Sequence, residues 1–405
     1  MKTLILFGCA SLRQGPRAIA QAKKVGLHPV LIDTADNIAF FNAGYDQIVE
    51  QRVVNEKSYS AAYLIINELA ESHDLAAIYT FEEYSVEICA KLNQAFSLPG
   101  SSPESVSLVR DKSLCRNCLR EAGMLQPLSA RVTSFEEATL FMKKSATDSF
   151  IIKPIDAAGS QGVSRIERDN EEQLSLAIAL LLPDQQKNFL IEEFISGNEY
   201  SIEGFFHQER PVFFGITSKS LFPGDSFVEN MHVFPAKLSL SLQKNILAQV
   251  KCALGATQLT VGHFHVECWL HDETIIIGEI HNRPGGDYIH LLTEIATGIE
   301  TYTSVFKQFH SLPITDVTSP GHIYNAGIRY FHASPGKLSS ITGIDEVNEH
   351  PNVILTEINV KKDDHIHLIT QSSQRVGCMV AKHNSADALL ELLDWGTTHV
   401  KFEVD

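Results

Sequence analysis

The chain has 405 residues, of which 44% are hydrophobic and 20% are charged, so its composition is that of an ordinary globular protein with room for two or three domains. Its 33 basic and 49 acidic residues give a formal net charge of -16, and no Lys/Arg cluster stands out. This balance makes nucleic acid and anionic membrane surfaces poor candidate partners.

The seven cysteines are scattered between Cys9 and Cys378, without the dense spacing of a disulfide framework. This usage favours a reducing, cytoplasmic location. The short apolar run after Met1 meets Arg13 and Arg17 with no cleavage-type site, so we interpret it as a strand rather than a signal peptide. No later stretch approaches the roughly 20 apolar residues that span a bilayer.

The first 110 residues alternate apolar strand-like runs with helical patterns. The predicted elements are, in chain order, strand 3–8, helix 14–25, strand 29–33, helix 59–72, strand 76–80 and a helix ending at Phe96. Unbroken apolar strands are typical of buried parallel sheets, which predicts a half-Rossmann domain. Asp33 would suit a ribose, but the loop over 8–15 lacks the G-x-G-x-x-G spacing, so an NAD-binding dehydrogenase is the least favoured interpretation.

After a Pro/Gly-rich break at 98–103 and a helical stretch that ends at Gly123, the pattern changes to strands and turns. The predicted elements are strand 150–154, helix 171–182, strand 189–195, strands within 199–214, helix 241–254, strands 261–269 and 274–280, a helical segment over 288–309, and a final helix over 385–395. We therefore predict three domains: 1–110, 111–318 with a lid at about 127–200, and a small α/β subdomain over 319–405.

Two carboxylates, Glu267 and Glu279, terminate neighbouring apolar strand-like runs, and an arginine and a glycine-rich turn follow the second. Carboxylate oxygens are the hard ligands that Mg²⁺ prefers, and Arg283 can hold a phosphate or carboxylate by two parallel hydrogen bonds. The pattern favours a divalent metal beside a polyphosphate. A structural Arg-Glu pair at a sheet edge is the alternative.

Three further features are interpreted together with Glu267 and Glu279. Lys153 ends an apolar strand and precedes a glycine-bearing loop, as in phosphate cradles, although no Walker A sequence occurs. Glu199 lies where a carboxylate could accept hydrogen bonds from ribose hydroxyls, or it is a solvated strand residue. His263 and His265 share a strand face with Glu267, which leaves a zinc site as a less favoured alternative.

The motifs, taken in order, resemble those of the ATP-grasp superfamily, most closely its carboxylate-amine ligases such as the bacterial L-amino acid ligases (dipeptide synthetases). The resemblance spans essentially the whole chain, through motifs at 111–112, 152–154, 159–162, 192–199, 267 and 279–286. It implies an α/β (α+β overall) architecture: an ATP-grasp fold with an N-terminal half-Rossmann preATP-grasp domain and a C-terminal α/β segment.

The resemblance implies ATP and Mg²⁺ (or Mn²⁺) as cofactors. The residues expected at the nucleotide are Lys112, Lys153, Ser160, Gly162, Glu192, Phe194, Ile195 and Glu199. Lys112 and Lys153 would contact the phosphates, and the loop that contains Ser160 and Gly162 would close over them. Glu192, Phe194 and Ile195 would line the adenine. Glu199 would bind the ribose.

The resemblance also implies the metal and substrate residues. Glu267 and Glu279 would carry the metal, and Arg283, acting with Lys153 as a catalytic group, would hold the acyl phosphate. The residues expected at the substrates are Glu83, which can face a substrate amino group, His232, Arg283 and Gly286.

One position departs from the family pattern. The family usually has asparagine two residues after the second metal glutamate, where this chain has His281, with Asn282 one residue later. On a strand, a shift of one residue turns a side chain to the opposite face. Either His281 ligates or borders the metal, or the metal shell is incomplete.

The expected reaction is ATP-dependent amide formation between a small carboxylic acid, such as an amino acid, and an amine. The acid becomes an acyl phosphate, the amine attacks it, and ADP and phosphate are released; no protein nucleophile is needed. The expected partners are small-molecule carboxylate and amine substrates, and possibly a second copy in a homodimer. The alternatives are an ATP-grasp carboxylase or nucleotide-pathway ligase, and a non-catalytic ATP-binding homologue.

Overall fold

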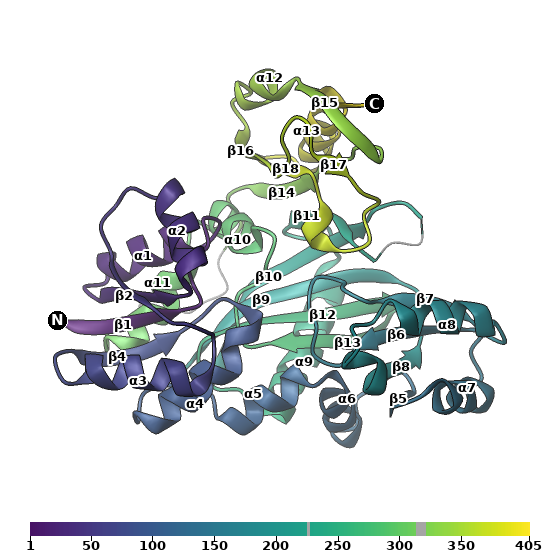
Figure 1. Ribbon diagram of the computed structural model, residues 1–405, viewed down its shortest axis with the longest axis horizontal. Coiled ribbons are helices and arrows are strands. Elements are labelled where there is room, and N and C mark those ends of the chain that lie inside the picture. The colour runs from purple at the N-terminus through teal and green to yellow at the C-terminus, as the bar shows by residue number, and fades with distance from the viewer. Residues whose placement is uncertain (225–226, 313–320) are drawn as a thin grey trace.

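The computed structural model describes residues 1–224, 227–312 and 321–405. Figure 1 shows three groups of elements around a long central sheet: the N-terminal domain, a lid subdomain on the opposite side, and the C-terminal segment above. The predicted boundary between residues 318 and 319 lies outside the described residues. In the part of the chain that the structure describes, no helix has the length and apolar character needed to cross a membrane.

The N-terminal domain contains a parallel sheet, as the sequence predicts, in the order β3-β2-β1-β4. Its elements are β1 (Lys2–Phe7), α1 (Gly15–Lys24), β2 (His28–Asp33), α2 (Ala35–Gly44), β3 (Glu50–Val53), α3 (Tyr59–Ala70), β4 (Asp74–Tyr79), η1 (Glu83–Ser85) and α4 (Val86–Ala95). Ile5 and Phe7 pack in the cluster that contains α3, and Leu4 and Leu6 in the cluster that contains α1. Burial on both faces explains the unbroken apolar run.

The lid subdomain is a four-stranded antiparallel sheet in the order β5-β8-β6-β7. Helices α5 (Pro103–Arg110) and α6 (Lys112–Glu121) precede it. The elements of the lid are β5 (Ser129–Val132), α7 (Phe135–Lys144), β6 (Ser149–Pro154), β7 (Ser164–Glu167), α8 (Glu171–Ala179), η2 (Gln185–Lys187) and β8 (Phe189–Glu193). Phe150, Ile152, Phe189 and Ile191 form its core with residues of α7 and α8.

The central sheet has the order β13-β12-β9-β10-β11-β14-β18-β16. Its first half, with helix α9, consists of β9 (Asn198–His207), β10 (Arg210–Leu221), β11 (Glu229–Phe234), α9 (Leu240–Thr257), β12 (His263–His271) and β13 (Thr274–His281). Asp272 and Glu273 join β12 to β13, both with positive φ, as a two-residue hairpin turn requires. After a register shift between Val266 and Cys268, His265 lies opposite His281.

The C-terminal segment completes the same sheet. After α10 (Ile289–Thr297) and α11 (Thr301–Phe309), which Gly298 separates, its elements are β14 (Asn325–Tyr330), β15 (Gly336–Thr342), α12 (Ile344–Asn348), β16 (Val353–Ile358), β17 (His365–Ile366), η3 (Ser372–Gln374), β18 (Gly377–His383), α13 (Ala386–His399) and β19 (Lys401–Val404). Strands β14, β18 and β16 extend the central sheet, and β17, β15 and β19 form a separate small sheet. The segment is thus integrated with the domain that precedes it.

Candidate active site

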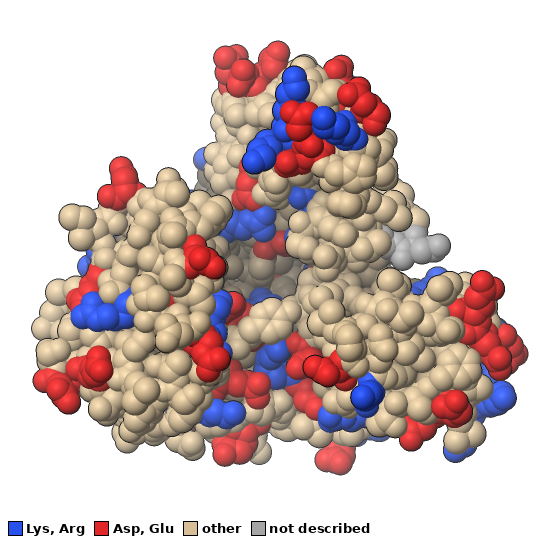
Figure 2. All heavy atoms as spheres, viewed as in Figure 1, with Lys and Arg blue, Asp and Glu red and all other residues tan. Residues whose placement is uncertain are grey.

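A cavity of about 560 Å³ lies between the lid, the central sheet and the C-terminal segment. In Figure 2 the corresponding face is hollowed, with both basic and acidic side chains inside the hollow. The residues predicted at the site line this cavity, except Gly162 and Glu83. Gly162 instead forms a turn with φ +69°, and a Cβ there would come within 3.0 to 3.3 Å of Leu181 and Pro154.

The three predicted metal residues converge. Glu267 lies on β12, Glu279 and His281 lie on β13, and one ligand atom of each lies within 4.8 Å of the other two. The carboxylates supply hard oxygen ligands, and one or two carboxylates beside substrate phosphates suit Mg²⁺. The donor set therefore fits the divalent cation that the sequence predicts.

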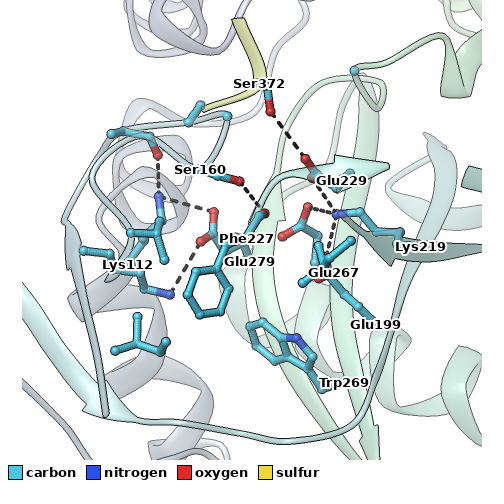
Figure 3. Close-up of a pocket in the computed structure, with 18 of the residues that line it drawn as sticks. Lys112, Ser160, Glu199, Lys219, Phe227, Glu229, Glu267, Trp269, Glu279 and Ser372 are labelled. Carbon is cyan, nitrogen blue, oxygen red and sulfur yellow. Dashed lines mark hydrogen bonds and ion pairs between the residues drawn. The ribbon is translucent and has the colours of Figure 1, made fainter. Parts of the chain in front are cut away.

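Two lysines from different elements hold Glu279 (Figure 3). Lys112 is the first residue of α6, and its Nζ lies 3.2 Å from Glu279 and 2.7 Å from the Ala157 carbonyl oxygen. Lys153 extends from β6, with its Nζ 3.6 Å from the other Glu279 oxygen. Burial alone would raise the pKa of the Glu279 carboxyl, but the two ammonium groups lower it below its usual value. The arrangement brings two ammonium groups to one carboxylate in the cavity.

Lys153 has a second partner, Glu192. The Lys153 Nζ lies 2.6 Å from Glu192, whose other oxygen accepts a hydrogen bond from the buried Arg116 at 3.0 Å. Despite burial, these two cations lower the pKa of Glu192 to about 2. Glu192 lines the cavity, but its carboxylate positions Lys153. The sequence analysis did not identify Arg116, whose partner lies 76 residues away.

Lys219 is another residue that the sequence analysis missed. Its buried Nζ lies 2.7 Å from Glu267, 2.6 Å from Glu199 and 3.4 Å from Glu229 (Figure 3). The three carboxylates raise the pKa of Lys219 despite its burial. Burial, together with Glu267 and Glu229, raises the pKa of Glu199 to about 7, against the opposing effect of Lys219.

His263 and His265 on β12 belong to no group of three ligand atoms among the described residues, which disfavours the zinc alternative. His263 contacts the Tyr79 hydroxyl at 2.7 Å through Nδ1 and the Thr301 carbonyl oxygen at 3.0 Å through Nε2. His265 bridges Glu203, at 2.9 Å, and Glu267, at 3.4 Å. Burial lowers the pKa of His265, but Glu203 outweighs this effect and raises it to about 9. A protonated His265 forms ion pairs with both Glu203 and Glu267.

Glu83 lies outside the cavity lining, although it is tied to residues that form the cavity. Its carboxylate pairs with Arg110 at 2.6 Å, with His281 Nδ1 at 2.9 Å, and with Arg283. Against the effect of burial, Arg283 and His281 hold the pKa of Glu83 well below its usual range. Both oxygens are engaged, so Glu83 orients Arg283 and His281 here; its expected contact with a substrate amino group stays a prediction.

His281 and Asn282 occupy different environments, as strand alternation requires. His281 lines the large cavity, whereas Asn282 lines a separate small one. The Asn282 amide donates to the carbonyl oxygens of Val261 and His263, each at 2.9 Å. Among these two residues, His281 is the one beside the carboxylates.

One end of the cavity has an apolar lining. Phe194, Ile195, Trp269 and Ile151 line it, and Phe194 lies against Phe227 with ring centroids 6.5 Å apart. Flat apolar surfaces of this kind suit a planar base. This end is compatible with an adenine ring.

The predicted phosphate loop is held at two points. The Ser160 hydroxyl donates to the Phe227 carbonyl oxygen at 2.8 Å (Figure 3). The Ser372 backbone N–H donates to the Gly159 carbonyl oxygen at 3.2 Å. Ser372 comes from the C-terminal segment. The loop therefore bridges the lid, the strand connection before β11 and the C-terminal segment.

The remaining part of the cavity contains His232, Glu229, Gly286 and Asp287. Arg375, from the C-terminal segment, donates two hydrogen bonds to Asp287 at 2.6 and 2.7 Å, and His232 Nε2 lies 3.2 Å from the same carboxylate. Despite burial, Arg375 and His232 hold the pKa of Asp287 well below its usual range. No atom within 4 Å would meet a Cβ at Gly286.

Asp33, the acidic residue beside the N-terminal loop, already has hydrogen-bond partners within its own domain. Asp33 is 1% exposed, and its carboxylate accepts from the backbone N–H groups of Ala10 at 3.0 Å and Thr34 at 2.8 Å. These bonds leave it poorly placed for a ribose. The geometry disfavours the NAD-binding alternative.

Two protein families match parts of the chain. Residues 147–290 match an ATP-grasp domain, and residues 329–405 match L-amino acid ligase C-terminal domain 2. The predicted ATP-grasp fold is thereby confirmed, with an N-terminal parallel α/β sheet and antiparallel ATP-grasp sheets.

Individual proteins are also similar to this chain. It is 26% identical over 210 residues to an alanine–anticapsin ligase of Bacillus subtilis, covering 46% of this chain and 44% of the relative. It is 22% identical over 407 residues to a formate-dependent phosphoribosylglycinamide formyltransferase of Francisella tularensis, covering 98% and 97%. The crystal structure of an L-amino acid ligase from Bacillus licheniformis superposes with a TM-score of 0.84 at 19% identity, covering 100% and 99%.

Proposed function

Because this chain joins an ATP-grasp domain to the C-terminal domain of L-amino acid ligases, we propose that it is an ATP-dependent carboxylate-amine ligase. It joins an amino acid or similar small acid to an amine, such as a second amino acid, and releases ADP and phosphate. The observation that carries this proposal is the convergence of Lys112 and Lys153 on Glu279, beside Glu267 and His281. These groups suit a metal and a triphosphate, and no covalent protein intermediate is required.

The nucleotide lies with its base at the apolar end, against Phe194, Ile195 and Trp269. Glu199 accepts from the ribose hydroxyls. Lys112 and Lys153 exchange their pairing with Glu279 for phosphate oxygens.

Glu267 and Glu279 hold Mg²⁺ or Mn²⁺, with His281 at the edge of the metal shell. When bound, the metal would supply neutralisation of the triphosphate charge. Lys219, which pairs with Glu267 at 2.7 Å, would be the further cation available to the transferring phosphoryl group.

The acid and the amine meet beyond the phosphates. Arg283, fixed by Glu83, stabilises the acyl phosphate with its remaining guanidinium N–H groups. Glu229 is the candidate for the substrate ammonium group, because its ionic and hydroxyl partners among the described residues, Lys219 and Ser372, lie at 3.4 Å each. Asp287 is already neutralised by Arg375 and His232 and serves as a wall of the site.

The test is ADP release by the purified protein with ATP, Mg²⁺ and pooled amino acids, followed by mass spectrometry of the products. The proposal expects ADP release that depends on both an acid and an amine, with a product whose mass is the sum of the two less water. ADP formation without amine dependence would contradict it. A Glu279→Gln variant, tested in parallel, excludes a contaminating ATPase.

A nucleotide-pathway ligase is the second candidate, because the full-length similarity to the formyltransferase favours it. That reaction would use formate and phosphoribosylglycinamide with the same ATP site. Supplying these two substrates in place of amino acids, and measuring product mass, distinguishes the candidates.

A further inference from the structure

A second cluster of ligand atoms lies in the N-terminal domain. His28 begins β2, Glu50 begins β3, and His73 lies in the turn between α3 and β4. One ligand atom of each lies within 4.8 Å of the others, and their side chains are 19% to 33% exposed. None of the three lines the large cavity, so the proposed ligase chemistry does not use them.

The hydrogen bonds of His73 determine which of its nitrogens faces the cluster. Its Nδ1 lies 3.1 Å from the Leu69 carbonyl oxygen, which can only accept, and 2.9 Å from the Ser72 hydroxyl, which can donate or accept, so both contacts are satisfied when Nδ1 carries the proton. In the neutral ring, Nε2 then presents a lone pair, and it lies 3.5 Å from Glu50 Oε2. Two acceptors that face each other at this distance need a proton or a cation between them.

The other two members point to the same place. His28 Nε2 lies 2.7 Å from the same Glu50 oxygen, and the His28 and His73 rings are nearly parallel, at an interplanar angle of 18°. Arg52 binds the opposite Glu50 oxygen at 2.7 Å. Partners of this kind, a backbone carbonyl on one imidazole and a donor on the carboxylate, orient ligands in metal sites.

We propose that His28, Glu50 and His73 bind a divalent transition metal of the zinc class, through both Nε2 atoms and Glu50 Oε2, with water in the fourth position. Two imidazoles and one carboxylate favour zinc over Mg²⁺, which prefers oxygen ligands. The metal would fasten the edge strand β3 to β2 and to the start of β4. Its role is structural and independent of the ligase reaction.

The test compares variants of the metal-free full-length chain in a Glu279→Gln background, which removes one ligand of the cavity cluster. Zn²⁺ is titrated against a chromogenic chelator, and the thermal midpoint is measured with and without Zn²⁺. His28→Gln/His73→Gln is the test variant. His365→Gln/His367→Gln is the matched control, because these exposed rings also lie 4.9 Å apart but belong to no three-ligand cluster in the described residues.

We expect the control to bind one more Zn²⁺ per chain than the test variant. In the test variant, the Zn²⁺ affinity of this site should fall by roughly 100-fold or more, because loss of an orienting partner alone typically costs 10- to 100-fold. Zn²⁺ should raise the thermal midpoint of the control only. Equal stoichiometry in the two variants, or no Zn²⁺ binding by either, overturns the proposal. Neither result bears on ADP release, which is measured with Mg²⁺.

Discussion

The loop after β1 and the loop after β6 both follow a buried apolar strand and both contain glycine, but their surroundings differ. In the first, Gly8 N–H donates to the Ile32 carbonyl oxygen, and Asp33 binds the N–H group of Ala10. In the second, residues 157–161 line a cavity with Lys112, Lys153 and Glu279. The polar groups of the first loop bond to neighbouring backbone and to Asp33. The second loop faces the charged side chains of Lys112, Lys153 and Glu279, which a ligand could contact. Two lysines that converge on one carboxylate, rather than glycine spacing, mark the candidate phosphate site.

The largest expected effect comes from Glu279→Gln. The change removes a metal ligand and the shared partner of both lysines, so ADP formation should fall by roughly 10³-fold or more, at least as much as loss of one transition-state hydrogen-bond donor. Steady-state ADP release measures it. Asp33→Asn is the counterpart at the N-terminal loop and should lower the thermal midpoint while changing ADP release far less. Residual activity within tenfold of wild type would contradict the proposed role of Glu279.

A smaller effect is expected from Lys153→Met, of about 10²- to 10³-fold on ADP release, because a phosphate cation is lost. The matched control is Lys57→Met. Lys57 pairs with Glu82 and, at 3.6 Å, with Asp33 beside the first loop. Its replacement should leave the KM for ATP within about threefold of wild type. Equal losses in the two variants would remove the distinction between the loops.

The pH dependence of stability should separate His263 from His265 on β12. His265 has a folded pKa of about 9 against an ordinary 6.5, so its contribution to stability is complete below pH 6.5 and is lost as pH rises through 9. His263, which packs against the N-terminal domain, has a pKa lowered to about 4 by burial, so its contribution is present above pH 6.5 and is lost as pH falls through 4.

Denaturant unfolding of metal-free protein across this pH range measures both effects. His265→Gln should flatten the alkaline limb and His263→Gln the acidic limb. The pH slope is the readout, since either change also lowers the overall free energy of unfolding. Unchanged alkaline slope in His265→Gln would contradict the cationic state of His265.

The smallest expected effect is that of His281→Asn, which restores the residue usual for the family. Activity should stay within roughly tenfold of wild type, and the rate ratio between Mg²⁺ and Mn²⁺ should rise, because an amide oxygen suits Mg²⁺ better than an imidazole nitrogen. Rates measured in each metal give this ratio. A ratio that does not change would place His281 outside the metal shell.

Much of the fold could be predicted because buried parallel strands and the β12–β13 hairpin have strong local patterns. Helix α2 and strand β3 were missed. Helix α2 leaves Phe40 65% exposed beside the buried Phe41, so it lacks a clear apolar face, and β3 is a short edge strand with the polar sequence Glu-Gln-Arg-Val.

Within the candidate site, the ordered motifs led to the Glu267, Glu279 and His281 cluster. They could not reveal Lys219 or Arg116, because each is a single basic residue whose meaning depends on carboxylates 48 and 76 residues away. They also place Glu192 at the adenine, which stays a prediction, but they could not show that its carboxylate pairs with Lys153. Such pairings are properties of tertiary packing, which no local pattern records.

The sharing of one β-sheet between the ATP-grasp region and the C-terminal segment has a consequence for engineering. Strand β14 pairs with β11, with Met231 opposite Arg329 and His232 opposite Ile328. A chimera that exchanged everything after α11 would have to re-form that register and also supply Arg375 to Asp287. Altered selectivity should therefore be sought by grafting the short connection around Ser372 rather than by transplanting the whole module.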